Sequence, residues 1–396
     1  MAEHESNVSK DAIRVLTTAD IKAPSSKCCQ SSVCHRFDST WPSTIFPVWS
    51  AAAAASIDIG SRIMTSFMSV ILRCNKFQQD VSPLYEFWIM DHDSLIGYML
   101  PKFVTQMAWA GTAFEVNHTT RTIHLRAKAR IGETISMACE REFVSLCRLN
   151  MFNVHGVKKW LETWDANGDA EHHPIRGLGV HLAGLKVPSP LRGVLGIVTV
   201  GVHMNMYTVT RPEGGDARMQ IWVAKRSQNV TYAGKLDQLV AGAMDPRDNN
   251  RAIEALRREA MEEAGLTVDA KTGRVSRDGA YVGVLQRGPW ISFFDKKDGI
   301  AGSERGQLEP GIRFTFDLEV EAGFVPEPCE PEAIAGFMLK SVNEVKRGLK
   351  CREWKPNSAL VMLDFLLRKG QIRPEEDVLF RHLRPALQRR LPFNGI

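Results

Sequence analysis

The sequence predicts a layered α/β domain in the C-terminal half of the chain, preceded by a smaller α+β module and an N-terminal extension. Strand and helix patterns alternate from about residue 198 onward, which is typical of a layered domain. Residues 1–66 are rich in Ser, Thr and Ala and show no sustained period, so we expect disorder there, or a spurious start upstream of Met64. The predicted divisions are 1–66, 67–190 and 191–393.

Composition limits the class of protein. The chain has 396 residues, of which 44% are apolar and 24% charged, and a formal net charge of +5 that is scattered rather than gathered in a basic arm. We therefore expect no nucleic acid as partner. Eight spread cysteines, no secretory signal and no apolar run of about 18 residues favour a cytoplasmic protein that does not enter a membrane. No pattern indicates an oligomeric state.

The module from 67 to 190 begins with a hairpin pattern. Residues 84–89 form a predicted strand, 91–94 a turn and 96–100 the partner strand, which Pro101 closes. Helices are expected around 102–109 and 154–164. Because no titratable residues cluster in this module, its sequence predicts no chemistry.

The main domain opens with a long apolar strand. Strands are expected at 198–207, 219–224, 281–285 and 312–319, and helices at 342–349 and 358–368. Lys225 and Arg226 end the second strand and are candidate diphosphate-binding residues, although strand-end surface charges are as simple an interpretation. Trp222 and Trp290 are candidates for stacking on an aromatic group, but we expect both to be buried in the core.

The strongest chemical signal is a helix between Gly242 and Leu266. The segment reads GAMDPRDNNRAIEALRREAMEEAGL, a glycine-containing loop followed by a helix that Gly265 is expected to cap. Glu259, Glu262 and Glu263 share one face at i, i+3 and i+4, whereas the expected buried stripe comprises Ile253, Leu256, Ala260 and Ala264.

Three carboxylates on one helical turn repel one another, and a hard divalent cation relieves that repulsion. Mg²⁺ prefers carboxylate and phosphate oxygens, so this turn suits a metal-bridged diphosphate. A solvated surface would give a similar pattern, because Arg258 lies four residues from both Glu254 and Glu262 and can form ion pairs with them. The acidic turn alone does not decide between these interpretations.

The full string Arg258-Glu259-Ala260-Met261-Glu262-Glu263-Ala264-Gly265-Leu266 resembles the core of the Nudix box. This resemblance implies an α/β/α sandwich with a mixed sheet and a hydrolase that cleaves diphosphate bonds with Mg²⁺ or Mn²⁺. It also implies that Glu259, Glu262 and Glu263 bind the metal, that the Gly242 backbone completes the metal shell, and that Arg258 orients a glutamate. Glu259 or Glu262 is the expected general base.

The loop before the helix departs from the family pattern. Counted back from Arg258, the family's glutamate and glycine fall on Asn250 and Met244, whereas Gly242 is present two residues earlier. The loop is therefore expected to be two residues longer than usual. A downstream family glutamate falls on Ala333, with Glu332, Glu330, Glu304 and Glu309 as candidate replacements.

Residues around the box resemble the Nudix branch related to thiamine pyrophosphokinase, over roughly 70–393. The stretches that carry this resemblance are Trp222–Ser227, Tyr232–Gly242, Trp354–Ser358 and Gly370–Glu375, with Ile96-Gly97-Tyr98 in the module. The branch implies thiamine diphosphate or its oxidised analogues as substrate, with no kinase activity expected. The alternatives are an 8-oxo-dGDP-type diphosphatase and a catalytically weak module that binds a ligand or partner.

Overall fold

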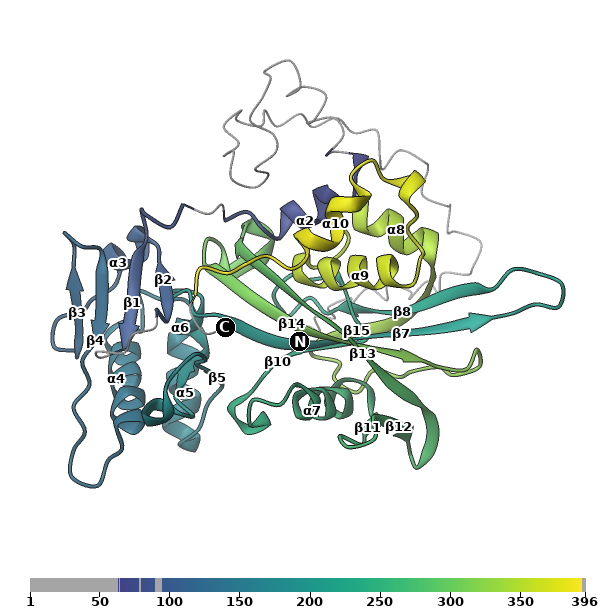
Figure 1. Cartoon of the computed structure of the whole chain (residues 1–396). Helices are drawn as coiled ribbons and strands as arrows, with labels where there is room; N and C mark the ends of the chain where they lie inside the picture. The colour runs from purple at the N-terminus through teal and green to yellow at the C-terminus, as the bar shows by residue number, and fades with distance from the viewer. Residues whose placement is uncertain (1–62, 64, 78–79, 90–94, 394–396) are drawn as a thin grey trace, which may run out of the picture. The chain divides into compact units, whose positions relative to one another are not determined.

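The computed structural model describes residues 63, 65–77, 80–89 and 95–393 (Figure 1). The extension expected over 1–66, apart from residues 63, 65 and 66, lies outside the described residues, as does the turn expected at 91–94. In the described part of the chain, no helix has the length and apolar character needed to cross a membrane.

The larger sheet is mixed, because β14 and β7 run parallel while the other neighbouring strands are antiparallel. Its order is β11-β12-β13-β14-β7-β8-β15, with β10 also paired to β7 and β9 to β8. The strands are β7 (Thr199–Thr210), β8 (Arg218–Arg226), β9 (Leu236–Asp237), β10 (Val240–Ala243), β11 (Thr267–Val268), β12 (Arg274–Arg277), β13 (Ala280–Lys296), β14 (Leu308–Glu319) and β15 (Ile334–Ser341).

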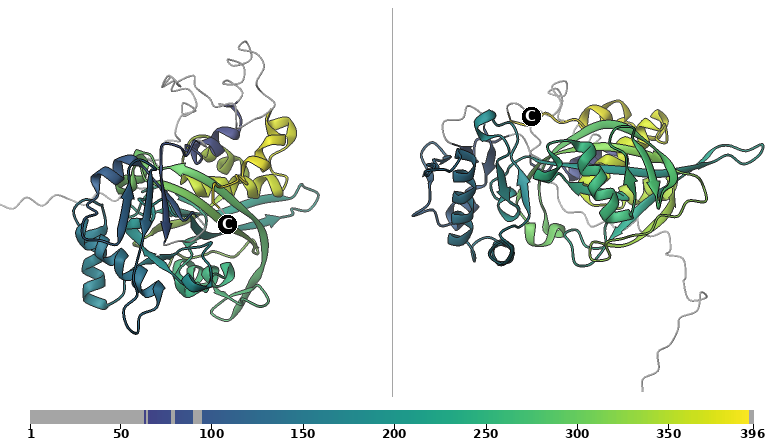
Figure 2. Two further views of the ribbon diagram at one scale, coloured as in Figure 1. Left: turned by 60° about the vertical axis from the view of Figure 1, so that its left-hand side comes forward. Right: turned by 90° about the horizontal axis from the view of Figure 1, so that it is seen from below.

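Helices cover both faces of this sheet, so the predicted α/β/α sandwich is confirmed. Alternation along β7 sends Val202 and Met204 into the core under α7, and Tyr207 into the core on the other face. The left-hand view of Figure 2 shows α7 and the yellow C-terminal helices on opposite sides of the sheet. The helices are α7 (Ala252–Ala264) on one face, and α2 (Met68–Arg73), α8 (Val342–Lys350), α9 (Pro356–Arg368) and α10 (Phe380–Ala386) on the other.

The module has a four-stranded sheet of order β2-β1-β4-β3, packed with helices as an α+β unit. The predicted hairpin is confirmed, because β1 pairs antiparallel with β2. The elements are β1 (Tyr85–Ile89), β2 (Gly97–Met99), α3 (Pro101–Gln106), β3 (Phe114–Asn117), β4 (Thr122–Leu125), α4 (Ile135–Leu149), α5 (Val157–Asn167), β5 (His172–Pro174), β6 (Lys186–Pro188) and α6 (Ser189–Arg192). Short 3-10 helices are η2 (Val180–Leu182), η3 (Pro246–Asp248), η4 (Gly299–Glu304) and η5 (Pro374–Glu376).

The limits 67–190 and 191–393 remain predictions. Within the first range, α2 packs against α8, α9 and α10 rather than on the four-stranded sheet. At the other end of the module, Tyr98 of β2 contacts Phe393 edge to face, with ring centroids 5.4 Å apart. Residues from the N-terminal half of the chain therefore contact the C-terminal helices and Phe393.

Candidate active site

The acidic helix α7 forms as predicted and rests on β10 and β7. Gly265 ends it in the left-handed conformation, with φ of 63°, and donates its N–H to Met261 O. The buried stripe is Ala252, Ala255, Leu256, Ala260 and Ala264. The small side chains on this stripe let the helix lie close to the sheet, whereas Ile253, which we expected to be buried, is partly exposed.

Glu259 lies directly against the backbone of β10. A Cβ atom added at Gly242 would overlap the Glu259 carboxylate. Residues with a side chain therefore do not fit at this position without displacing Glu259. The Glu259 side chain is only 13% exposed. The structure thus brings Gly242 against the acidic turn, while the role of its backbone in a metal shell stays a prediction.

The other two glutamates point to different partners. Glu263 accepts a hydrogen bond from the Ala241 N–H at 2.8 Å, whereas Glu262 is half exposed and accepts from Arg258 Nη1 at 3.1 Å. Among the described residues, no group of three His, Cys, Asp or Glu side chains is arranged to hold a metal ion. The assignment of Glu259, Glu262 and Glu263 as metal ligands stays a prediction.

Arg258 joins the helix to the preceding loop. Its Nη1 donates to Glu259 Oε1 at 2.9 Å, and its Nη2 donates to the carbonyl of Ala243 at 3.0 Å. Its Nε and Nη2 also donate to the two carboxylate oxygens of Asp248, at 3.2 and 3.1 Å. Such a two-point contact fixes both distance and orientation of the guanidinium.

Asp248 is the residue that sequence reasoning missed. It is buried, at 3% exposed, and also accepts the Asp245 N–H at 2.7 Å. It lies six residues after Gly242, the spacing that the resemblance gives between the family's glycine and glutamate. The position counted back from Arg258, Asn250, is exposed. A forward count from Gly242 would have identified Asp248.

Two asparagines follow Asp248 in the loop that we expect to be longer than usual. Asn249 and Asn250 both have left-handed backbone conformations, with φ of 48° and 58°. Asparagine is one of the few residues other than glycine that adopts this region readily. Asn249 and Asn250 therefore form a tight turn between Asp248 and α7, and Asp248 keeps its contact with Arg258.

Burial disfavours the charged form of the two carboxyls beside Gly242. Burial raises the pKa of Glu259 to about 7, with Glu262 adding to the rise and Arg258 opposing it. Burial and the neighbouring Glu259 raise the pKa of Glu263 well above its usual range. A divalent cation fits this donor set, because it would favour the charged form of both groups, and the absence of a side chain at Gly242 lets the Glu259 carboxylate lie against the loop backbone.

The strand-end cations differ from each other. Lys225 is exposed, whereas Arg226 is held by Asp237 at 3.0 Å and by the carbonyl of Thr231 at 2.9 Å. Lys355 also reaches Asp237, at 3.1 Å, from the loop before α9. Assignment of Lys225 and Arg226 to substrate binding stays a prediction, and the structure adds Lys355 beside Arg226.

The other candidate residues are distributed as follows. Glu309 is buried between Arg313, at 2.9 Å, and Lys297, at 3.3 Å, and Glu304 also pairs with Lys297. Glu332 has a hydrogen bond from Asn229 at 3.3 Å, near the end of β8. Trp222 is buried as expected, but Trp290 is 46% exposed, so the core prediction for Trp290 was wrong.

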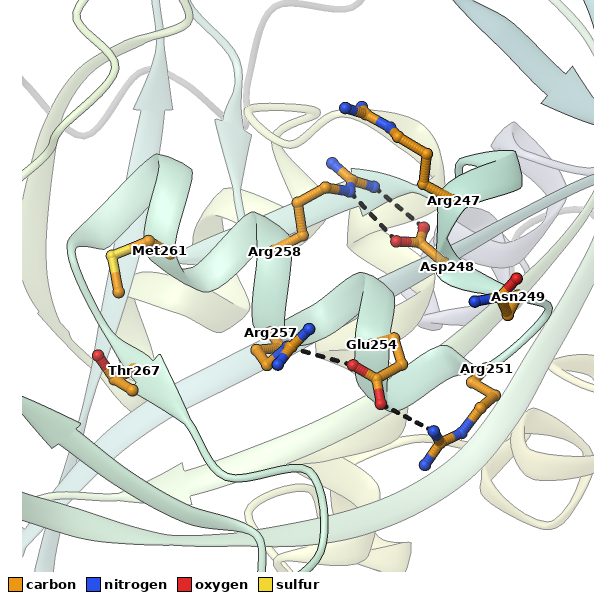
Figure 3. Close-up of a pocket in the computed structure, with 9 residues that line it drawn as sticks. All are labelled: Arg247, Asp248, Asn249, Arg251, Glu254, Arg257, Arg258, Met261 and Thr267. Atoms are coloured by element: carbon orange, nitrogen blue, oxygen red, sulfur yellow. Dashed lines mark hydrogen bonds and ion pairs between the residues drawn. The ribbon is translucent and has the colours of Figure 1, made fainter.

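A pocket of about 700 Å³ borders the outer face of α7 (Figure 3). Four arginines line it, and Figure 3 shows that three of them face carboxylates: Arg258 faces Asp248, while Arg251 and Arg257 flank Glu254. The remaining lining residues are Arg247, Asn249, Met261 and Thr267. Arg258 thus has one side on this pocket and the other on Glu259.

Residues 202–339 match the family model described as NUDIX domain. Together with the sandwich, the glycine loop and the acidic helix, this match shows that the chain carries a Nudix domain.

Relatives support the same conclusion. Nudix hydrolase 24, chloroplastic, of Arabidopsis thaliana is 34% identical over 48% of this chain and 46% of its own length. Nudix hydrolase 20, chloroplastic, of the same plant is 35% identical over 46% and 42%. An uncharacterized protein of Saccharomyces cerevisiae is 31% identical over 52% and 57%. The chain spans about half the length of these curated relatives.

Solved structures align more distantly. The NUDIX domain of Shewanella oneidensis NrtR, complexed with ADP ribose, covers 44% of this chain and 88% of its own, with a TM-score of 0.29 and 8% identity.

Proposed function

We propose that this chain hydrolyses a diphosphate bond in a small organic or nucleoside diphosphate, with Mg²⁺ or Mn²⁺ at Glu259, Glu262 and Glu263. The observation that carries the proposal is the contact of Glu259 with Gly242, beside Glu263 on the Ala241 N–H. A solvated helix face would not bury two carboxyls against a strand.

A bound divalent cation would neutralise charge on the diphosphate and lower the pKa of water. The chain's own residues supply the orientation. Arg258, fixed by Asp248, donates to Glu259 and Glu262 and so holds both carboxylates towards the loop. Either of these two carboxylates is suited to accept the proton of the attacking water, Glu262 being the more exposed.

The organic group is a separate part of the proposal. Thiamine diphosphate or its oxidised analogues are our first choice, on the resemblance of the segments around the box to the thiamine pyrophosphokinase-related branch. An 8-oxo-dGDP-type diphosphatase is the second. A catalytically weak module that binds a diphosphate without turnover is the third.

The test is release of phosphate from a substrate panel with Mg²⁺ or Mn²⁺. The panel contains thiamine diphosphate, oxothiamine diphosphate, 8-oxo-dGDP, ADP-ribose and NADH, and the variant is Glu262→Gln. A matched control is Glu254→Gln on the same helix, whose carboxylate pairs with Arg251 and Arg257 on the outer face. We expect turnover that Glu262→Gln lowers and Glu254→Gln retains.

Absence of turnover on every member of the panel, in a folded protein, would contradict the hydrolase proposal. Metal binding then decides what remains of it. Binding of Mn²⁺ that Glu262→Gln weakens would support the module that binds without turnover.

A further inference from the structure

A second polar cluster lies where β9 meets the start of α9. At its centre is Asp237, whose side chain is only 4% exposed. Its Oδ1 accepts from Ser358 Oγ at 2.5 Å and from the Gln238 N–H at 2.9 Å. Its Oδ2 accepts from Arg226 Nη1 at 3.0 Å and from Lys355 Nζ at 3.1 Å. We call Asp237, Arg226, Lys355 and Ser358 the Asp237 cluster.

This cluster has two cations and one anion. The side chains of Arg226 and Lys355 are 16% and 15% exposed, so water screens them poorly. Burial lowers the pKa of Lys355, and the nearby cations Arg226 and Arg313 lower it further. Asp237 opposes this effect and raises the pKa. Asp237 is the carboxylate that pairs with both of these partly buried cations, so the cluster itself carries one more cation than anion.

Donor capacity points the same way. An ammonium group has three N–H donors, and among the described contacts Lys355 Nζ donates to Asp237 alone. The N-terminal end of α9 adds partial positive charge, because the helix begins at Pro356 directly after Lys355. The cluster thus has spare donors and excess positive charge at one place.

The cluster is also close to the acidic turn. β9, which carries Asp237, is separated by two residues from β10, and the helix α7 that carries Glu263 packs on β10. Asp237 precedes Val240–Ala243 on the same short segment, so the cluster and the Gly242 loop are joined by a few residues of chain.

We propose that Lys355 and Arg226, held in place by Asp237, bind a phosphate group of the diphosphate whose other end lies at the acidic turn. Asp237 is a positioning residue here, because it fixes two side chains without touching the substrate. The placement of this site beside a diphosphate rests on the proposed function. Lys355, 118 residues from Asp237 in the sequence, is the residue that selects for phosphate.

The experiment measures binding of methylenediphosphonate, which resists hydrolysis, to the full chain in the presence of Mn²⁺ by calorimetry. The variants are Lys355→Gln and Lys355→Arg. The control is Lys235→Gln, since Lys235 is near Asp237 in sequence but donates to the Arg352 carbonyl at 2.8 Å. We expect Lys355→Gln to weaken the Kd by about tenfold or more, Lys355→Arg to retain most binding and Lys235→Gln to change it by less than about twofold.

Equal binding by wild type and a folded Lys355→Gln variant would overturn the proposal, as would an equal loss in Lys235→Gln. If Lys355→Gln fails to fold, acetylation of the wild-type lysines provides the test. Methylenediphosphonate should protect Lys355 and leave Lys235 unchanged, and lack of protection of Lys355 would overturn the proposal.

These outcomes are separable from failure of the hydrolase proposal. Lysine-dependent binding without turnover on any substrate would support the phosphate site and contradict hydrolysis. Turnover with an unchanged KM in Lys355→Gln would support hydrolysis and overturn the phosphate site. A raised KM with little change in kcat is the result that the phosphate site predicts.

Discussion

Replacement of Asp248 by asparagine should loosen the loop that carries Gly242. The change removes the charge from a carboxylate that is 3% exposed and receives two hydrogen bonds from Arg258. Hydrogen bonds to charged groups contribute about 1.5–3 kcal/mol each, and breaking a fully buried ion pair costs about 3–5 kcal/mol. Arg258 is partly exposed and keeps Glu259, Glu262 and the Ala243 carbonyl as partners, so the lower part of this range applies.

We therefore expect Asp248→Asn to lower the free energy of unfolding by about 2–3 kcal/mol, measured by urea denaturation. Asp245→Asn is the matched control, because Asp245 pairs with Arg247, whose side chain is 75% exposed, and asparagine also caps helices. Its effect should stay below about 0.5 kcal/mol.

A double-mutant cycle with Arg258→Met isolates the pair itself. The expected coupling between Asp248 and Arg258 is at least about 1 kcal/mol. Adding Asn250→Glu to Asp248→Asn should not restore stability, because position 250 is exposed in the turn. Coupling near zero, or full rescue by Asn250→Glu, would refute the assignment of Asp248 as the partner of Arg258.

Three further predictions concern Gly242, Glu309 and metal binding. Gly242→Ala should lower kcat/KM by about tenfold or more, because the added Cβ would displace Glu259. The control is Gly323→Ala, where a Cβ meets nothing within 4 Å. Equal activities of the two variants would contradict this prediction. Burial opposes the charge on Glu309, but Lys297 and Arg313 outweigh it and lower the pKa of that carboxyl from 4.5 to about 2. The resulting stabilisation of about 3 kcal/mol is complete above pH 4.5 and lost as pH falls towards about 2. Urea denaturation at several pH values should therefore show a smaller loss of unfolding free energy at acid pH in Glu309→Gln than in the wild type. Mn²⁺ should raise the Tm of the wild type and chelation should reverse the rise, whereas a Tm shift of the same size in Glu263→Gln would argue against this carboxyl as a ligand.

Local sequence patterns predicted much of the main domain. Apolar runs indicated β7, β8 and β14, and helical spacing with Gly265 indicated α7 and its end. The helix α4, Ile135–Leu149, was not predicted, although Thr134 caps it by accepting the Met137 N–H and its buried side chains recur at helical spacing. Cys, Ser and β-branched residues with weak helix preference obscured that signal.

The candidate site was predicted only in part. The glutamates lie on one helix and could be assigned from adjacent residues, whereas Asp248 required the correct placement of the two-residue insertion. The Asp237 cluster joins residues that are distant in sequence, since Lys355 and Ser358 come from α9 and the loop before it. The contacts of Lys355 and Ser358 with Asp237 depend on how α9 packs on the sheet, which no local sequence pattern specifies.

The central claim is tested most directly by steady-state turnover of a diphosphate substrate by the wild type and by Glu259→Gln with Mn²⁺. Glu254→Gln serves as the control for a lost charge on the same helix. The structure predicts metal-dependent turnover that falls by about a hundredfold or more in Glu259→Gln and stays near wild type in Glu254→Gln. Turnover that is equal in all three proteins would contradict the assignment of the acidic turn beside Gly242 as the active site.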